Sequence, residues 1–182
     1  MTRYDDTPQG VLQFWRDAGP GRWFTKHPEF DQQCSELWAG AHLSAARRER
    51  DHWAADAAGV LALLILLDQY PRNAYRGTAH MYATDPLARH FARVAVDAGL
   101  DTRIEPELRA FCYMPFEHSE DLDDQRLAVR YMESLGPSWH EYALVHQRII
   151  ERFGRFPHRN AQLGRTSTSE ELQFLADGGF AG

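Results

Sequence analysis

The sequence predicts an all-α fold of about eight helices. Three observations support this: prolines and capping residues precede most apolar segments, apolar residues recur with the 3.6-residue period of a helix, and alternating strand patterns are absent. The chain has 182 residues, so we expect a single domain over residues 1–182. Short connections between the segments favour antiparallel helix pairs.

Two helices are expected near the N-terminus. Thr7 and Pro8 place a cap and an N1 proline before the first, and the Gly-Pro-Gly run at 19–21 ends it. Pro28 opens the second, a long segment whose apolar residues follow the helical period.

The most apolar segment is expected to form the central helix. Asp51 is predicted to cap this helix, which runs to about Tyr70, where Pro71 stops it. Its middle, VLALLILL, is apolar all round, as in a helix with no face in water. The segment that follows, residues 71–84, is expected to be an ordered loop.

Two further helices are expected in the middle of the chain. The Asp-Pro pair at 85–86 begins the first, and Gly99 follows its end. The second runs from Pro106 to about Cys112 and is expected to be broken by the Met-Pro pair at 114–115.

Three helices are expected in the last third. Ser119 is predicted to cap a helix to about Leu135, with acidic residues in its first turn that suit the helix dipole. The Gly-Pro-Ser turn at 136–138 begins a helix that ends at Gly154. Residues 168–171 form a T-x-x-E capping box for a short final helix.

Composition and charge argue against several classes of protein. There are 26 acidic residues and 20 lysines and arginines, a net charge of −6, which argues against a nucleic-acid partner. The two cysteines make no disulfide framework. The longest apolar run, residues 57–67, is far shorter than the roughly 20 residues of a membrane span. With no apolar targeting segment at the N-terminus, the expectation is a soluble, cytoplasmic protein without a membrane partner.

Residues 152–168 are the densest polar segment, with four arginines, a histidine, an asparagine and three hydroxyl residues. Gly154 and Pro157 restrict the backbone between them. Guanidinium groups beside hydroxyl groups and a helix N-terminus are typical of a carboxylate or phosphate site. Alternatively, these side chains hold the loop in place by hydrogen bonding to buried carbonyl groups.

Two other segments carry candidate chemistry. Asp68–Asn73, with Arg76 beyond it, directly follows the buried helix, either at the floor of a cleft or as a tie at the helix end. His118 has carboxylates on both sides, which suits a histidine–carboxylate acid/base pair, one half of a metal site, or a simple helix cap. His146 is expected to be half-buried, as a ligand-binding group or a core histidine.

Several motifs are absent: no P-loop, dinucleotide fingerprint, zinc-protease helix, nucleophile elbow or duplicated di-iron motif occurs. No metal or cofactor is therefore expected.

Four segments together resemble one family. They are VLQFW, LLDQYPRNAYRGTAHMYATDPLA, FCYMPFEHSEDLDDQ and RFGRFPHRNAQLGRTSTSEE. In this order they resemble the bacterial family of unknown function numbered nine-two-four, over about residues 11–175. The resemblance implies a tetratricopeptide-like helical fold. It implies no established reaction and no catalytic residues.

Three functional hypotheses follow. The first is a polar pocket for a small anionic molecule, with histidine acid/base chemistry if the protein is an enzyme. The second is a peptide-binding module, and the third is that the motif residues are purely structural. A homodimer through the N-terminal aromatic residues is also open. The candidate catalytic residues are His118, Glu120 and His158, and the candidate ligand-binding residues are Asp68, Gln69, Arg72, Asn73, Arg76, His146, Arg155, Arg159, Asn160 and Arg165.

Overall fold

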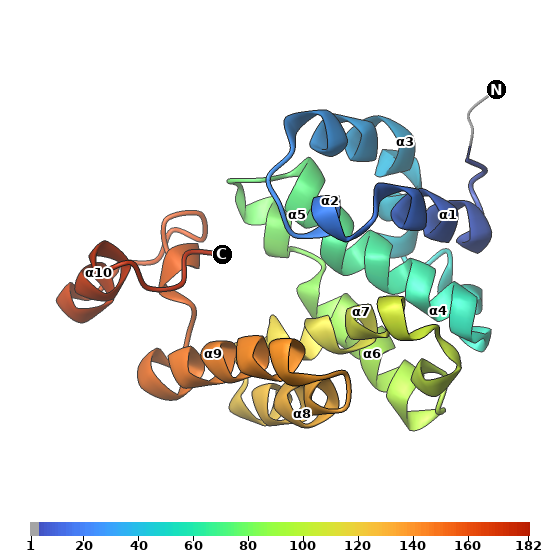
Figure 1. Cartoon of the computed structure of the whole chain (residues 1–182). Helices are drawn as coiled ribbons and strands as arrows, with labels where there is room; N and C mark the ends of the chain where they lie inside the picture. The colour runs from blue at the N-terminus through green and yellow to red at the C-terminus, as the bar shows by residue number, and fades with distance from the viewer. Residues whose placement is uncertain (1–3) are drawn as a thin grey trace. The chain divides into compact units, whose positions relative to one another are not determined.

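The all-α prediction is confirmed in a computed structural model, which describes residues 4–182 and contains no strand among them (Figure 1). The first three residues of the N-terminal stretch lie outside the described part. The α-helices are α1 (Pro8–Ala18), α2 (Pro20–Trp23), α3 (Pro28–Ala46), α4 (Ala57–Leu64), α5 (Tyr70–Ala74), α6 (Asp85–Asp97), α7 (Pro106–Glu117), α8 (Leu122–Glu133), α9 (Pro137–Phe153) and α10 (Ser169–Ala176). None of the helices in residues 4–182 has the length and hydrophobicity to cross a bilayer.

The described chain divides into two compact units. The N-terminal unit comprises residues 4–76 and 80–115, and the C-terminal unit comprises residues 77–79 and 116–182. The N-terminal unit therefore contains α1 to α6 and most of α7, and the C-terminal unit contains α8 to α10.

The core of the N-terminal unit is built around α4, as the apolar run predicts. Residues 60–67 are buried without a break. Phe14 and Trp15 lie beside Ile65 and Leu66 of this run, and the rings of Trp15 and Phe30 are 5.8 Å apart. Each large apolar side chain removed from water contributes about 1.5–3 kcal/mol, so this contact region supplies much of the unit's stability.

The N-terminus of α4 differs from the prediction. Asp51 opens a 3-10 turn that ends at Ala55, and Asp56 is the residue that caps α4. The Asp56 backbone is extended, and its carboxylate accepts a hydrogen bond of 2.8 Å from the Gly59 N–H. The 3-10 turn folds back closely on α4, so a Cβ atom at Gly59 would overlap the Trp53 carbonyl oxygen.

Pro71 does not stop the central helix as predicted. A π-helical turn, Ile65–Gln69, follows α4, and α5 begins directly at Tyr70. The Tyr70 N–H donates to the Ile65 carbonyl, five residues back, and Pro71 lies in the first turn of α5, where a missing N–H is tolerated. The expected loop at 71–84 consequently begins with α5 and also contains a 3-10 turn at Ala79–Tyr82.

Side chains donate to the carbonyl groups around this π turn. Pro71 has no N–H to offer Leu67, and the Tyr70 N–H is directed to Ile65, so local backbone bonding is incomplete. The donors are His42 Nδ1 to Leu66 at 2.9 Å, Thr84 Oγ1 to Leu67 at 2.6 Å, Arg72 Nη1 to Asp68 at 2.6 Å and Asn73 Nδ2 to Gln69 at 3.1 Å.

Two predicted helix boundaries near residue 115 are also wrong. Instead of breaking after Cys112, α7 continues through Pro115 to Glu117. Residues 110–114 are buried, and their packing outweighs the roughly 3 kcal/mol cost of a proline inside a helix. Asp121, and not Ser119, caps α8: its carboxylate accepts from the N–H groups of Asp123 and Asp124.

The other helix starts agree with the prediction to within a residue. α6 begins at Asp85 after Thr84, and α9 begins at Pro137 after Gly136. The capping box of α10 is confirmed: the Thr168 hydroxyl accepts from the Glu171 N–H at 3.2 Å, and the Glu171 carboxylate accepts from the Thr168 N–H at 2.7 Å.

Substituting Gly59→Ala is expected to lower the free energy of unfolding by about 1–3 kcal/mol, because the new methyl group displaces the Trp53 carbonyl. The matched control is Gly40→Ala in α3, where the Cβ meets nothing within 4 Å. There alanine is expected to stabilise by about 0.5–1 kcal/mol. Urea unfolding of both variants tests this, and equal effects would contradict the close approach.

Thr84→Val is expected to destabilise the protein by about 1–3 kcal/mol, because it leaves the buried Leu67 carbonyl without its hydroxyl donor. Thr102→Val removes a similar hydroxyl–carbonyl bond to Gly99 at an exposed position. This control is expected to change stability by less than about 0.5 kcal/mol. Thermal unfolding compares the two, and a Thr84→Val variant as stable as the control would rule out the role assigned to Thr84.

Candidate functional site

The predicted residues of the N-terminal unit lie together beside the π turn. Asp68 is 1% exposed, and Gln69 and Asn73 are also buried. The Gln69 amide donates to the Asp68 carboxylate at 2.6 Å. The Asp68 carboxylate also lies 3.3 Å from the Arg72 guanidinium, one turn further along the helix.

Arg72 and Arg76 both hold carboxylates of their own unit. Arg72 makes two bonds to Asp85, of 2.9 and 3.1 Å. Although burial lowers the pKa of Arg72, the Asp68 and Asp85 carboxylates outweigh it and raise that pKa above its usual value. Arg76 makes two bonds to Asp31, of 2.9 and 3.0 Å. Both guanidinium groups are therefore already paired with carboxylates of their own unit.

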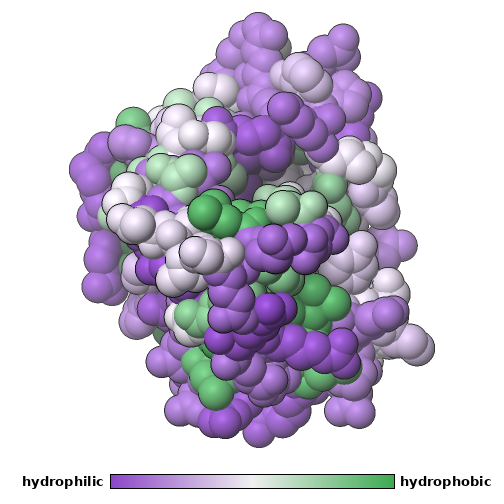
Figure 2. Space-filling view, turned by 90° about the vertical axis from the view of Figure 1, so that its left-hand side faces the viewer, coloured by the Kyte–Doolittle hydropathy of each residue, from purple (hydrophilic) through white to green (hydrophobic). Residues whose placement is uncertain are grey.

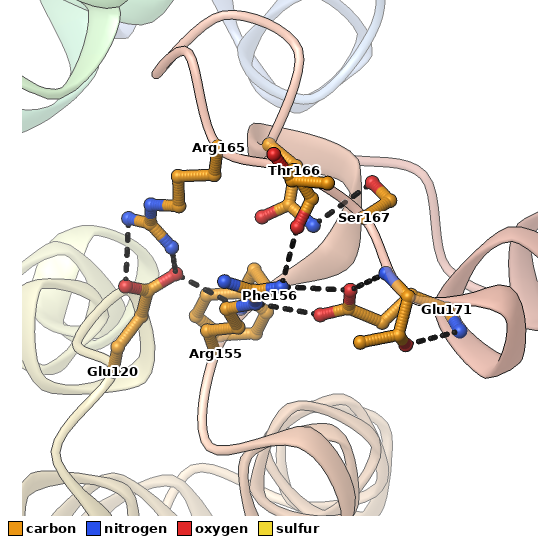
Figure 3. A network of polar contacts seen from close by, with 9 residues as sticks. Glu120, Arg155, Phe156, Arg165, Thr166, Ser167 and Glu171 are labelled. Atoms are coloured by element: carbon orange, nitrogen blue, oxygen red, sulfur yellow. Dashed lines mark hydrogen bonds and ion pairs between the residues drawn. The ribbon is translucent and has the colours of Figure 1, made fainter.

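In the C-terminal unit, Arg165 binds Glu120 in the same two-bond manner, with both bonds at 2.9 Å (Figure 3). The Phe156 N–H donates to the same carboxylate at 2.9 Å. Burial raises the pKa of Glu120, but the bonds from Arg165 and Phe156 prevail and lower it. Glu120 is therefore an anion that fixes the loop after α9.

Arg155 and Glu171 form a second such pair, joining the end of α9 to α10 (Figure 3). Their two bonds measure 2.6 and 2.8 Å, and Arg155 also donates to the Thr166 carbonyl at 3.0 Å. The bond from Arg155, aided by the Thr168 N–H and opposed by burial, lowers the pKa of Glu171 to about 2.

Asn160, the remaining amide of this segment, is 1% exposed. Its Nδ2 group donates to the Ser167 hydroxyl at 3.1 Å. Its Oδ1 atom is buried without a hydrogen-bond partner among residues 4–182.

The three predicted histidines lie near one another in the C-terminal unit, with His146 at the centre. The His118 and His146 rings are 6.5 Å apart. His146 Nδ1 is 2.9 Å from the Tyr142 carbonyl oxygen and 3.1 Å from the Glu117 carboxylate. Because a carbonyl oxygen only accepts, Nδ1 carries the proton, and Nε2 keeps the lone pair.

His146 and Glu117 thus form a buried histidine–carboxylate pair, with side chains 7% and 9% exposed. The sequence offered the residues on either side of His118 as its carboxylate partners. In the structure one of them, Glu117, contacts His146, which lies 29 positions further along the chain. A carboxylate on Nδ1 fixes the ring and its tautomer, the arrangement that supports acid/base work at Nε2.

His158 lies on the other side of the same aromatic group. Its ring is 5.6 Å from Phe156 and 5.3 Å from Phe180, which also lies 4.5 Å from His146. Desolvation, with the positive charge of Arg159 as the next cause, lowers the pKa of His158 to about 3. Its Nδ1 atom is buried and has no hydrogen-bond partner among the described residues. His158 is therefore neutral near pH 7.

Arg159 brings a buried positive charge next to this histidine. Arg159 is 7% exposed, and its guanidinium carbon lies 4.5 Å from the centroid of the Phe156 ring. Burial of a guanidinium against an aromatic face places the charge in a low-dielectric setting, where its effect on His158 is strong.

Sequence reasoning missed Glu117, Phe156 and Phe180 as parts of this cluster, and Asp85 as the partner of Arg72. These contacts join positions far apart in the chain, and no spacing rule reports them. Among residues 4–182, no group of three or more histidine, cysteine, aspartate or glutamate side chains is placed to hold a metal ion.

Comparison with known proteins gives one family and one structure. The model of the family described as bacterial protein of unknown function (DUF924) matches residues 11–179. The solved structure of a protein of unknown function from Agrobacterium tumefaciens is similar, with 48% identity and a TM-score of 0.92. The match covers 93% of this chain and 97% of that one. No curated protein matches the chain.

Glu171→Gln is expected to make the free energy of unfolding depend less steeply on pH in acid. The native pKa of Glu171 is about 2, below its ordinary value of 4.5, so its contribution is complete above pH 4.5 and is lost as the pH falls toward 2. The wild-type free energy of unfolding should therefore fall more steeply over this interval than that of the variant. Urea titrations at several pH values measure both slopes.

The control is Glu170→Gln, at the residue before Glu171 in α10, where the side chain is 62% exposed. Its slope should match that of the wild type. Equal slopes for all three proteins would show that the Arg155–Glu171 pair does not set the acid dependence.

Proposed function

The chain belongs to the bacterial family of unknown function DUF924, and we propose that it binds a small anionic molecule, a carboxylate or phosphate, at a histidine cluster formed by His118, His146, His158 and Arg159. The observation that carries the proposal is His158: a neutral imidazole with a buried, unbonded Nδ1, beside a buried guanidinium. A buried imidazole nitrogen without a hydrogen-bond partner is costly, and an anionic ligand that accepts a hydrogen bond from it relieves that cost.

The other arginines of the motifs do not serve this proposal. Arg155 and Arg165 each hold a carboxylate through two bonds, and an anion could bind them only by breaking those pairs. We therefore assign structural roles to Arg155, Arg165 and Glu120. We assign the anion-binding role to Arg159 and the imidazoles, because Arg159 lies next to His158 in the sequence and its positive charge acts on that imidazole.

The Glu117–His146 pair gives the same site the means to move a proton. Glu117 and the Tyr142 carbonyl hold the Nδ1–H, and Nε2 is the group that accepts a proton from a bound molecule. Phe180 lies over the His146 ring at 4.5 Å, so a ligand reaches His146 when Phe180 moves aside. This supports acid/base chemistry by His146 with His118 and His158 as its neighbours.

Binding of an anion is expected to raise the pKa of His158 from about 3, because its negative charge offsets the positive charge of Arg159. Binding and protonation then favour each other, so affinity should rise as the pH falls. Nuclear magnetic resonance of the imidazole nitrogens, with inorganic phosphate and acetate as probes, measures the pKa of each histidine with and without the anion.

The variant that tests the positive charge is Arg159→Gln, expected to weaken phosphate binding roughly tenfold by removing a charge-assisted bond. The matched control is Arg126→Gln on α8, an exposed arginine paired with Asp123, and it should bind as the wild type does. His158→Gln provides a second variant in case Arg159→Gln does not fold.

Two outcomes would refute this function. Imidazole signals that stay in place with either anion at about 10 mM, where a complex with a Kd of ~1 mM is about nine-tenths formed, would exclude the site. A lowered melting temperature in Arg159→Gln, with no anion raising that of the wild type, would assign these residues to structure alone.

A further inference from the structure

A groove of about 240 Å³ lies in the C-terminal unit, between α9, α10 and the segment after α10. Its apolar lining consists of Val145, Ile149, Phe153, Phe174 and Phe180. Three of these residues are spaced four apart on α9 and so share one face of that helix. The groove is distinct from the histidine cluster, although Phe180 borders both.

The walls of the groove are fixed by aromatic packing. The Phe153 and Phe174 rings lie 5.1 Å apart and join α9 to α10. Ile149 is 4% exposed and belongs to the core cluster that these rings cover. The groove is therefore a formed feature of the unit.

Two arginines complete the lining, and they differ in whether a carboxylate of the described chain pairs with them. Arg152 pairs with Glu170 at 2.9 Å and lies 4.7 Å over the Phe153 ring. Arg148 is exposed, and no carboxylate of residues 4–182 pairs with it. The groove thus combines an apolar floor with an available positive charge at its edge.

Seen from the α10 side of Figure 1, the surface has apolar areas between strongly hydrophilic side chains (Figure 2). The apolar lining of the groove and its arginine match a ligand that is itself divided into an apolar part and a charged part.

The volume sets the size of the ligand. A dry apolar cavity of about 150 Å³ holds one benzene ring, and pockets for drug-sized molecules begin near 300 Å³. A groove of about 240 Å³ therefore fits one aromatic ring or a short aliphatic chain.

We propose that this groove binds a small amphipathic carboxylate, an aromatic or short-chain aliphatic acid, with its apolar part against Phe153, Phe174 and Phe180 and its carboxylate on Arg148. The apolar contact provides affinity and the guanidinium selects an acid over a neutral molecule of the same shape. This site differs in chemistry from the anion site at the histidines, because its recognition needs the apolar part of the ligand, although Phe180 borders both.

Benzoate and octanoate are the probes, with benzyl alcohol as the neutral counterpart of benzoate. We expect both acids to move the methyl signals of Val145 and Ile149 in nuclear magnetic resonance spectra of the whole chain. Arg148→Gln should weaken benzoate binding roughly tenfold and leave benzyl alcohol unchanged. Because Arg148 is exposed, this variant should keep the wild-type melting temperature.

The matched control is Arg130→Gln, an exposed arginine on α8 that lies over Tyr131 and away from the groove lining. It should bind benzoate as the wild type does. Arg159→Gln, the variant that tests the histidine cluster, should leave benzoate binding unchanged, so the failure of one proposal can be distinguished from the failure of the other.

Three results would overturn the proposal. The first is methyl signals that do not respond to either acid, and the second is benzyl alcohol binding as tightly as benzoate. The third is a concentration-dependent dimer in sedimentation that Val145→Glu dissociates, because a second copy of the chain would then occupy the groove.

Discussion

The carbonyl groups of residues 66–69 are the constraint on which the N-terminal unit depends. They lie in the most buried part of the chain, and the π turn and Pro71 together remove the regular backbone donors of Leu66 and Leu67. His42 of α3 and Thr84 before α6 donate to these two carbonyl groups instead, and side chains of α5 add bonds to the next two. The polar residues that follow the apolar run are thus explained by backbone chemistry, and they join three helices to the centre of the unit.

In the C-terminal unit the corresponding constraint is the pairing of charged side chains. Arg155 and Arg165 each neutralise a carboxylate, and both carboxylates also accept a backbone N–H, so the loop after α9 is fixed at both ends. In the histidine cluster of the same unit, the imidazole of His158 is kept neutral beside Arg159, and its buried Nδ1 has no hydrogen-bond partner among residues 4–182. The same segment therefore holds structural and candidate functional residues within a few positions of each other.

Local signals in the sequence predicted the helices well, because caps and prolines act within one turn. The capping box at Thr168 and the cap at Thr7 were found in this way. The errors at Pro71 and Pro115 share a cause, because tertiary packing outweighed the local preference of proline. At Asp51 and Ser119 the helix is instead capped by an aspartate a few residues further along, Asp56 or Asp121, through an equally local hydrogen bond. The histidines were predicted as candidates, but the partnership of His146 with Glu117, and the covering ring of Phe180, depend on contacts that the sequence does not encode locally.

Phe180 is a wall common to the groove and to the histidine cluster. A molecule seated in the groove that holds this ring against His146 also restrains the movement that admits an anion to the imidazoles. Occupancy of one site then carries a free-energy cost for the other, and thermodynamic linkage makes that cost the same in both directions. A single aromatic side chain thus makes the two proposed sites antagonists without any contact between their ligands.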